Sequence, residues 1–251
     1  MRRDWVVGGC AWLLVAGLPL GAALAQTPAP ESVATGGLLY DKWWKAVPGA
    51  KAPVGDHPVW ASQTTNKLKG EATWRCKECH GWDYRGKDGA YGSGSHATGF
   101  PGVIAAGGKS LDELKAILKG SADRRHDFSS VLNDAALTHL ATFLKHGPVD
   151  LKPLIDLKTK KAVKAEADAG KKSFDACAAC HGADGATLNF GKPAKPEYVG
   201  TVARANPWEF QHKVRFGHPG SDPPMPAAAE LGLSLQDVLD LLAYSQTLRD
   251  K

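Results

Sequence analysis

Cysteine and methionine are scarce in this chain of 251 residues, which has five Cys and two Met. Four of the cysteines lie in two short motifs, and the fifth, Cys10, lies in an apolar leader that we expect to be removed. The mature chain therefore has no spare thiol for a disulfide or for nucleophilic catalysis. The methionines are Met1 and Met225, which leaves only Met225 as a possible thioether ligand.

Segments that alternate apolar and polar residues, as β-strands do, are also missing. Several stretches instead carry apolar residues at helical spacing, so we predict an all-α fold. The formal net charge of +5 is small. It does not indicate a nucleic-acid-binding surface, and we expect no nucleic-acid partner.

Residues 1–25 have the pattern of a secretory signal peptide. Arg2 and Arg3 precede an apolar run at residues 5–24, and small residues at 23 and 25 mark a cleavage site. We predict export to the periplasm with cleavage near Ala25. If the segment is retained, its length is enough to associate the chain with a membrane.

Capping residues and apolar spacing locate the helices. Ser110, Asn206 and Ser234 are predicted N-caps, and Gly120 and Gly217 follow predicted helix ends. We expect further helices at residues 36–45 and 135–145, and one from residue 167 into the second cysteine motif. We predict a flexible leader at residues 26–35 and a loop at residues 48–70.

Two CxxCH motifs organise the sequence. They are Cys76-Lys77-Glu78-Cys79-His80 and Cys177-Ala178-Ala179-Cys180-His181. Two thiols at this spacing bond to both vinyl groups of haem, while the adjacent imidazole binds the iron. We therefore predict two covalently bound haem c groups with His80 and His181 as proximal iron ligands. A zinc site built from both cysteine pairs is the weaker alternative, as is a thioredoxin-like dithiol.

The two halves of the chain repeat one plan. An offset of 101 positions relates Cys76 to Cys177, Leu140 to Leu241, and Phe143 to Tyr244. This repeat predicts a first domain at residues 26–147, followed by a linker and a second domain at residues 148–251.

With these motifs, the mature chain resembles the class I c-type cytochromes, and in particular their tandem dihaem members. The resemblance implies that the first and last helices of each domain cross. A glycine and an aromatic residue of one helix would meet a leucine and an aromatic residue of the other. In the second half the residues that fit are Gly170, Phe174, Leu241 and Tyr244.

In the first half, the helix at residues 135–145 supplies one side of this crossing. Two pairs compete for the other side, Gly36 with Tyr40 and Gly70 with Trp74. We favour Gly36 and Tyr40, because the segment before Trp74 has little helical pattern. The cytochrome resemblance then implies a long insertion before the first haem motif.

The resemblance also implies Met225 as the distal ligand of the second haem. Met225 lies 44 residues after His181, between prolines that favour an extended loop. For a lone methionine, packing in the core is the common role. Here the proline flanks and the spacing favour iron ligation.

The first half has no methionine, so its distal ligand must differ. The repeat projects Met225 onto position 124, and the nearest side chain able to bind iron is His126. We predict a bis-histidine pair of His80 and His126, with Asp127 or a nearby carbonyl orienting the second imidazole. His96 is the main rival, and an exposed loop position is the other reading of His126.

Different axial ligands imply different reduction potentials. A thioether favours ferrous iron more than a second imidazole does. The predicted function is therefore periplasmic electron transfer between redox proteins, from a lower-potential haem 1 to a higher-potential haem 2. A dihaem enzyme, peroxidase-like or acting on sulfur compounds, is the alternative, as is a haem subunit of a larger oxidoreductase. No catalytic residue is assigned.

Overall fold

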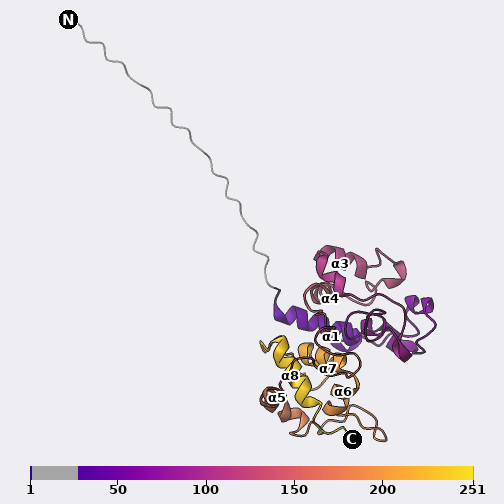
Figure 1. Cartoon of the computed structure of the whole chain (residues 1–251). Helices are drawn as coiled ribbons and strands as arrows, with labels where there is room; N and C mark the ends of the chain where they lie inside the picture. The colour runs from indigo at the N-terminus through magenta and orange to yellow at the C-terminus, as the bar shows by residue number, and fades with distance from the viewer. Residues whose placement is uncertain (2–27, 251) are drawn as a thin grey trace.

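The computed structural model describes Met1 and residues 28–250. The predicted signal peptide and its cleavage site therefore lie outside the described residues, apart from Met1. Between residues 28 and 250 the chain forms helices, turns and isolated β-bridges, with no β-strand. The all-α prediction is confirmed for this part of the chain (Figure 1).

Eight α-helices are connected by loops that contain short 3-10 turns. The α-helices are α1 (Pro30–Ala46), α2 (Cys76–His80), α3 (Leu111–Leu118), α4 (Asp134–His146), α5 (Ala167–His181), α6 (Val199–Ala205), α7 (Pro207–Phe216) and α8 (Leu235–Ser245) among the described residues. The 3-10 turns are η1 (Pro58–Ser62), η2 (Gly70–Trp74), η3 (Gly94–His96), η4 (Ile104–Gly108) and η5 (Arg124–His126).

The predicted caps set three helix starts. The Ser110 hydroxyl accepts the amide of Glu113 at 3.2 Å, and the Glu113 carboxylate accepts the amide of Ser110 at 2.6 Å. Ser234 begins α8 with the same reciprocal arrangement, and Asn206 caps α7. These bonds satisfy amides that have no partner inside the helix.

The predicted flexible leader is wrong for residues 30–35, because α1 already begins at Pro30. Proline has no amide N–H, but an amide in the first turn of a helix has no partner inside the helix. Proline is therefore compatible with the first position of a helix. Ala34 is buried, so packing holds this first part of α1 in place.

Two equivalent helix crossings form the framework, α1 over α4 and α5 over α8. A Cβ added to Gly36 would overlap the carbonyl of His139, and one added to Gly170 would overlap the carbonyl of Asp240. The ring of Tyr40 lies 5.3 Å from that of Phe143, centroid to centroid. Gly36 and Tyr40, rather than Gly70 and Trp74, therefore form the first crossing.

In the second crossing, the rings of Phe174 and Tyr244 lie 5.4 Å apart. Leu241 is buried there, 2 % exposed. The same combination of a glycine, a leucine and two aromatic residues thus joins both helix pairs.

The two halves share their apolar cores. Phe216 of α7 packs in the cluster around α1 and α4, while Trp82 and Tyr91 pack in the cluster around α5 and α8. Leu151 and Ile155, from the predicted linker, are also buried in the second cluster. Figure 1 shows α1 lying between α4 and α7, and both helices contact it.

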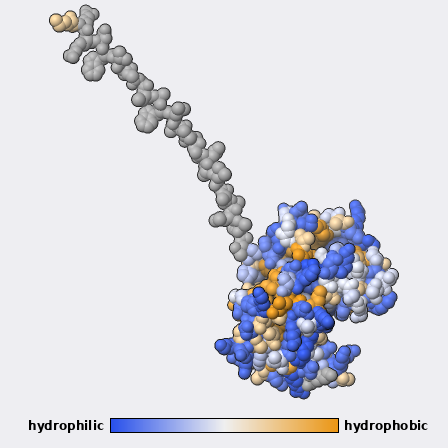
Figure 2. All heavy atoms as spheres, in the orientation of Figure 1, coloured by the Kyte–Doolittle hydropathy of each residue, from blue (hydrophilic) through white to orange (hydrophobic). Residues whose placement is uncertain are grey.

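On the face seen in Figure 2, hydrophilic residues cover most of the surface and apolar residues gather near its middle. Within the described residues, no helix has the length and apolar character needed to cross a membrane.

Candidate functional site

The first CxxCH motif forms α2, and its histidine is held by one strong hydrogen bond. Nδ1 of His80 lies 2.7 Å from the carbonyl oxygen of Pro101. A carbonyl accepts only, so Nδ1 carries the proton and Nε2 keeps its lone pair. A backbone partner of this kind orients an imidazole that binds metal through its other nitrogen.

A small cleft opens beside this motif. It brings together the two motif cysteines, three histidines and an apolar wall. The lining residues are His57, Val59, Thr73, Trp74, Arg75, Cys76, Cys79, His80, Phe100, His126 and Phe128. A donor set of two thiols and facing imidazoles within apolar walls fits a covalently attached haem.

His126 lies across this cleft from His80. The two ring centroids are 6.2 Å apart and the ring planes are inclined at 79°. Two imidazoles that share one metal through facing nitrogens have centroids about 6 Å apart, because each metal–nitrogen bond is about 2 Å long. The spacing therefore suits a bis-histidine iron site.

The carbonyl of Ile117 acts on the ring of His126 and raises its pKa, against the larger effect of burial. A carbonyl was one of the two orienting groups expected from the sequence. The other, Asp127, instead accepts the amide of Ser129 at 2.8 Å. Burial lowers the pKa of His126, so its imidazole is neutral and able to bind metal at neutral pH.

His96, the rival ligand, lies outside this cleft. Its ring stacks on Tyr91 with centroids 4.7 Å apart, and its Nδ1 lies 3.6 Å from Oε2 of Glu78. Nearly half of the side chain is exposed. The arrangement places His96 in a polar surface network.

His57 was missed by the sequence analysis, which gave it no role. It caps η1 from the loop before the first motif, and it is 5 % exposed. Its ring centroid lies 6.1 Å from that of His126. Burial lowers the pKa of His57 to about 4, with a smaller contribution from His126. No periodicity or motif in residues 48–70 singles this histidine out.

The thiols of the first motif are not tuned for dithiol redox chemistry. Burial raises the pKa values of Cys76 and Cys79 to about 12, whereas reactive cysteines have lowered pKa values. In the described part of the chain, no three His, Cys, Asp or Glu side chains are grouped to hold a metal ion by themselves. Both observations disfavour the dithiol and zinc alternatives.

The second CxxCH motif forms the last turns of α5, and its backbone repeats that of the first. Gly81 and Gly182 follow the two histidines with nearly identical angles, φ +77° and ψ 158° against φ +79° and ψ 158°. The amide of Gly86 donates to the carbonyl of His80, and that of Thr187 to the carbonyl of His181. These donors are also 101 positions apart.

The side chains around the second motif are more open. Cys180 is exposed, and the ring of Phe190, 48 % exposed, lies 5.8 Å from that of His181. Nδ1 of His181 is buried and has no hydrogen-bond partner among the described residues. Exposed apolar side chains beside an accessible thiol fit a surface that a haem would cover.

Met225 is half-buried in the segment between α7 and α8. Its amide donates to the hydroxyl of Ser221 at 2.9 Å, and its carbonyl oxygen would lie 2.8 Å from a Cβ added to Gly217. The bond to Ser221 anchors the backbone of the proline-flanked segment. The pairing of Met225 with His181 on one iron stays a prediction.

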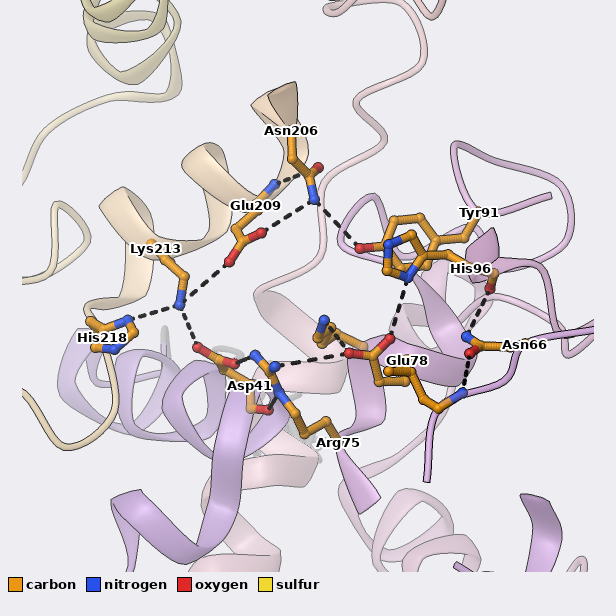
Figure 3. A network of polar contacts seen from close by, with 12 residues as sticks. Asp41, Asn66, Arg75, Glu78, Tyr91, His96, Asn206, Glu209, Lys213 and His218 are labelled. Atoms are coloured by element: carbon orange, nitrogen blue, oxygen red, sulfur yellow. Dashed lines mark hydrogen bonds and ion pairs between the residues drawn. The ribbon is translucent and has the colours of Figure 1, made fainter. Parts of the chain in front are cut away.

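A buried charge network, not foreseen from the sequence, joins the first motif to α7 (Figure 3). Asp41 of α1 pairs with Arg75, and its Oδ2 lies 2.8 Å from Nζ of Lys213. Burial acts to raise the pKa of Asp41, but Lys213 and Arg75 lower it well below its usual range. Asp41 is therefore ionised at all moderate pH values. Its carboxylate compensates a cation from each half of the chain.

Trp82, next to the first motif, is surrounded by positive charge. The side chains of Arg75, Lys77 and Lys213 lie 5.7, 5.1 and 5.4 Å from its ring centre. Cations over an indole stabilise its negative ring face and oppose removal of an electron. This arrangement favours a structural role for Trp82 over a role as an electron relay.

Comparison with known proteins identifies one region. Residues 167–249 match the family model for cytochrome c. The match spans α5 to α8, including the second CxxCH motif and Met225. It supports a c-type cytochrome domain with covalently bound haem c and haem-based electron transfer. Searches of the curated proteins and of the solved structures found no match.

Proposed function

From a cytochrome c domain at residues 167–249, we propose that the whole chain is an exported dihaem c-type cytochrome. Haem 1 is bonded to Cys76 and Cys79, and haem 2 to Cys177 and Cys180. The protein accepts electrons from one redox protein and passes them to another. The signal-peptide pattern in residues 1–25 supports a periplasmic location.

One observation carries the assignment of haem 1. The rings of His80 and His126 face one cleft with centroids 6.2 Å apart, and the cleft also contains both motif thiols. His80 would be the proximal ligand and His126 the distal one. The carbonyl of Pro101 would fix the ring orientation of His80.

The backbone repeat at the second motif supports haem 2. His181 would be its proximal ligand and Met225 its distal ligand. The family model covers both residues, and the proline-flanked segment of Met225 is anchored by Ser221.

Haem supplies a one-electron iron couple when bound. The residues of this chain would set its potential through the axial ligands, with a bis-histidine haem 1 lower than a histidine–methionine haem 2. Electrons would then enter at haem 1 and leave from haem 2. A titration with haem 1 as the high-potential centre would contradict this direction.

The decisive experiment replaces His126 with Ala in the holoprotein and uses His96→Ala as the matched control. Loss of His126 should remove one low-spin bis-histidine signal in paramagnetic resonance and should change the optical spectrum. The control should keep both spectra, because His96 stacks on Tyr91 outside the cleft. If the bis-histidine signal survives in His126→Ala, the distal assignment is wrong.

Carbon monoxide separates electron transfer from catalysis. A six-coordinate relay should bind carbon monoxide slowly or not at all at ferrous haem 1, because His126 occupies the sixth position. Rapid binding in the unmodified protein would favour a dihaem enzyme. A haem subunit of a larger oxidoreductase would instead copurify with its catalytic partner.

A further inference from the structure

The loop between α1 and the first motif places a histidine in the haem 1 cleft by several backbone anchors. The amide of His57 donates to Oγ1 of Thr73 at 2.8 Å. Trp60, three residues later, is 3 % exposed and donates from Nε1 to the carbonyl of Leu68. The turn η1 also packs against η5, the turn that carries His126. The loop is therefore a wall of the cleft.

The hydrogen bonds of His57 define which nitrogen carries its proton. Nδ1 accepts the amide of Val59 at 3.2 Å, so Nδ1 is unprotonated and the proton is on Nε2. Nε2 is buried and has no partner among the described residues. A buried donor without an acceptor destabilises a protein, so this group is expected to have a function.

The same geometry argues against His57 as the iron ligand. Binding through Nε2 requires that this nitrogen lose its proton, which would move to Nδ1 and break the bond from Val59. The ring is also held by Phe128, stacked with centroids 5.2 Å apart, and by the edge of Trp74 at 4.6 Å. His57 is thus fixed as a donor beside His126.

His126 is held more lightly than His80. It ends the three-residue turn η5, and its amide bonds to the carbonyl of Asp123 at 2.8 Å. His80 lies in the covalent motif itself. If a ligand leaves the iron, His126 is the one that a local movement of a surface turn releases.

We propose that His57 is a distal hydrogen-bond donor for a small molecule that binds the iron of haem 1 in place of His126. The ligand class is a diatomic molecule or small anion whose bound form accepts a hydrogen bond. Donors in the distal pocket govern which exogenous ligands a haem retains. This inference rests on the proposed attachment of haem 1 to the first motif.

The test opens the sixth position with His126→Gly and then varies His57 in that background. His57→Phe removes the donor while preserving a planar ring among aromatic neighbours, and His57→Gln keeps an N–H donor. The probes are cyanide for the ferric haem and carbon monoxide for the ferrous haem. His126→Ala replaces His126→Gly if the glycine variant does not fold.

With His57 intact, cyanide should bind about tenfold more tightly than with His57→Phe, which corresponds to about 1.4 kcal/mol. The stretching frequency of bound carbon monoxide should be lower with His57 or Gln than with Phe. His96→Phe in the same background should change neither value.

Equal cyanide affinities and equal carbon monoxide frequencies for His57 and Phe would overturn the proposal. A shift of the haem 1 potential alone, with both ligand readouts unchanged, would assign Nε2 to a haem propionate and would also overturn it. Failure of the proposed function is distinct. In that case the first motif would carry no haem, or the bis-histidine signal would survive loss of His126.

Discussion

The hydroxyl of Tyr84 lies 2.7 Å from Nδ1 of His212, a contact between residues 128 positions apart. On the other side of the ring, Nε2 lies 3.0 Å from the carbonyl oxygen of Gly37. The carbonyl accepts the proton of Nε2, so the Tyr84 hydroxyl donates to Nδ1. A neutral imidazole of α7 is thus bonded on both sides to the first half.

Replacing Tyr84 with Phe should destabilise the protein by about 1–3 kcal/mol, because it leaves Nδ1 of His212 buried without a donor. Chemical denaturation of the holoprotein, followed by circular dichroism, measures this change. Tyr244→Phe is the control, since it removes a hydroxyl from a half-buried ring of α8. Equal stability of Tyr84→Phe and the wild type would show that the contact contributes nothing.

His212 should also make stability depend on pH. Burial is the main cause that lowers its pKa to about 3, assisted by Lys213 and Arg215 and opposed by Asp41 and the Gly37 carbonyl. Between about pH 6.5 and pH 3 the unfolded chain binds one more proton than the folded chain at this residue. The contribution of His212 to the free energy of unfolding is therefore complete above pH 6.5. It falls by up to about 1.4 kcal/mol for each pH unit of acidification below that value.

The measurement is the unfolding free energy at several values between pH 6 and pH 4. His212→Gln should reduce the slope of the unfolding free energy against pH by up to about 1.4 kcal/mol per pH unit, which is the effect of one proton. His146→Gln, at an exposed position, should leave this slope nearly unchanged. A slope that is the same in His212→Gln and the wild type would mean that His212 does not titrate as described.

Asp41→Asn should be strongly destabilising, on the order of 3–5 kcal/mol, because it removes a buried carboxylate that pairs with Arg75 and Lys213, whose side chains are only 18 % and 17 % exposed. Asp134→Asn is the matched control. Asp134 bonds to Lys115 at 2.8 Å and to Lys119 at 3.1 Å, but it is largely exposed. Asp134→Asn should therefore lower the free energy of unfolding by only about 0–1 kcal/mol. Denaturation curves that move equally in both variants would contradict this ranking.

The two glycine crossings predict parallel effects. Gly36→Ala and Gly170→Ala should each cost on the order of 3 kcal/mol, because the added methyl group meets a backbone carbonyl that cannot rotate away. Gly108→Ala is the control, since a Cβ there meets nothing within 4 Å. Thermal melts of the three variants test this. A melt of Gly36→Ala that matches that of Gly108→Ala would refute the close helix contact.

The sequence was sufficient for features that are encoded locally. Ser110 and Ser234 indicate helix starts because a cap acts within three residues. Gly36 and Gly170 are recognisable because each is followed four positions later by an aromatic residue, Tyr40 or Phe174, as the cytochrome resemblance implies. The motif and the repeat also predict that His80 and His126 lie together, and the structure places both on one cleft, while their role as iron ligands stays a prediction.

Features that depend on contacts between distant residues were not predictable. His57 and His212 have no motif, and their partners come from other segments of the chain. Leu151 and Ile155 lie among prolines and charged residues, and such a composition predicts a linker. In the structure both side chains are buried. Only the tertiary packing of the chain gives these residues their roles.

Under the proposed function, the wall formed by the loop before the first motif would also set an order of events during assembly of the protein. The bond from His57 to Thr73 is one of three hydrogen bonds that hold this loop. The amide of Gly70 donates to Asp56 at 2.6 Å, and the indole of Trp74 donates to the carbonyl of Gly55 at 3.0 Å. A bulky porphyrin would have to reach Cys76 and Cys79 before these hydrogen bonds form. The attachment machinery would therefore act on a chain whose loop is still undocked, and closure of the loop would be a late step of maturation.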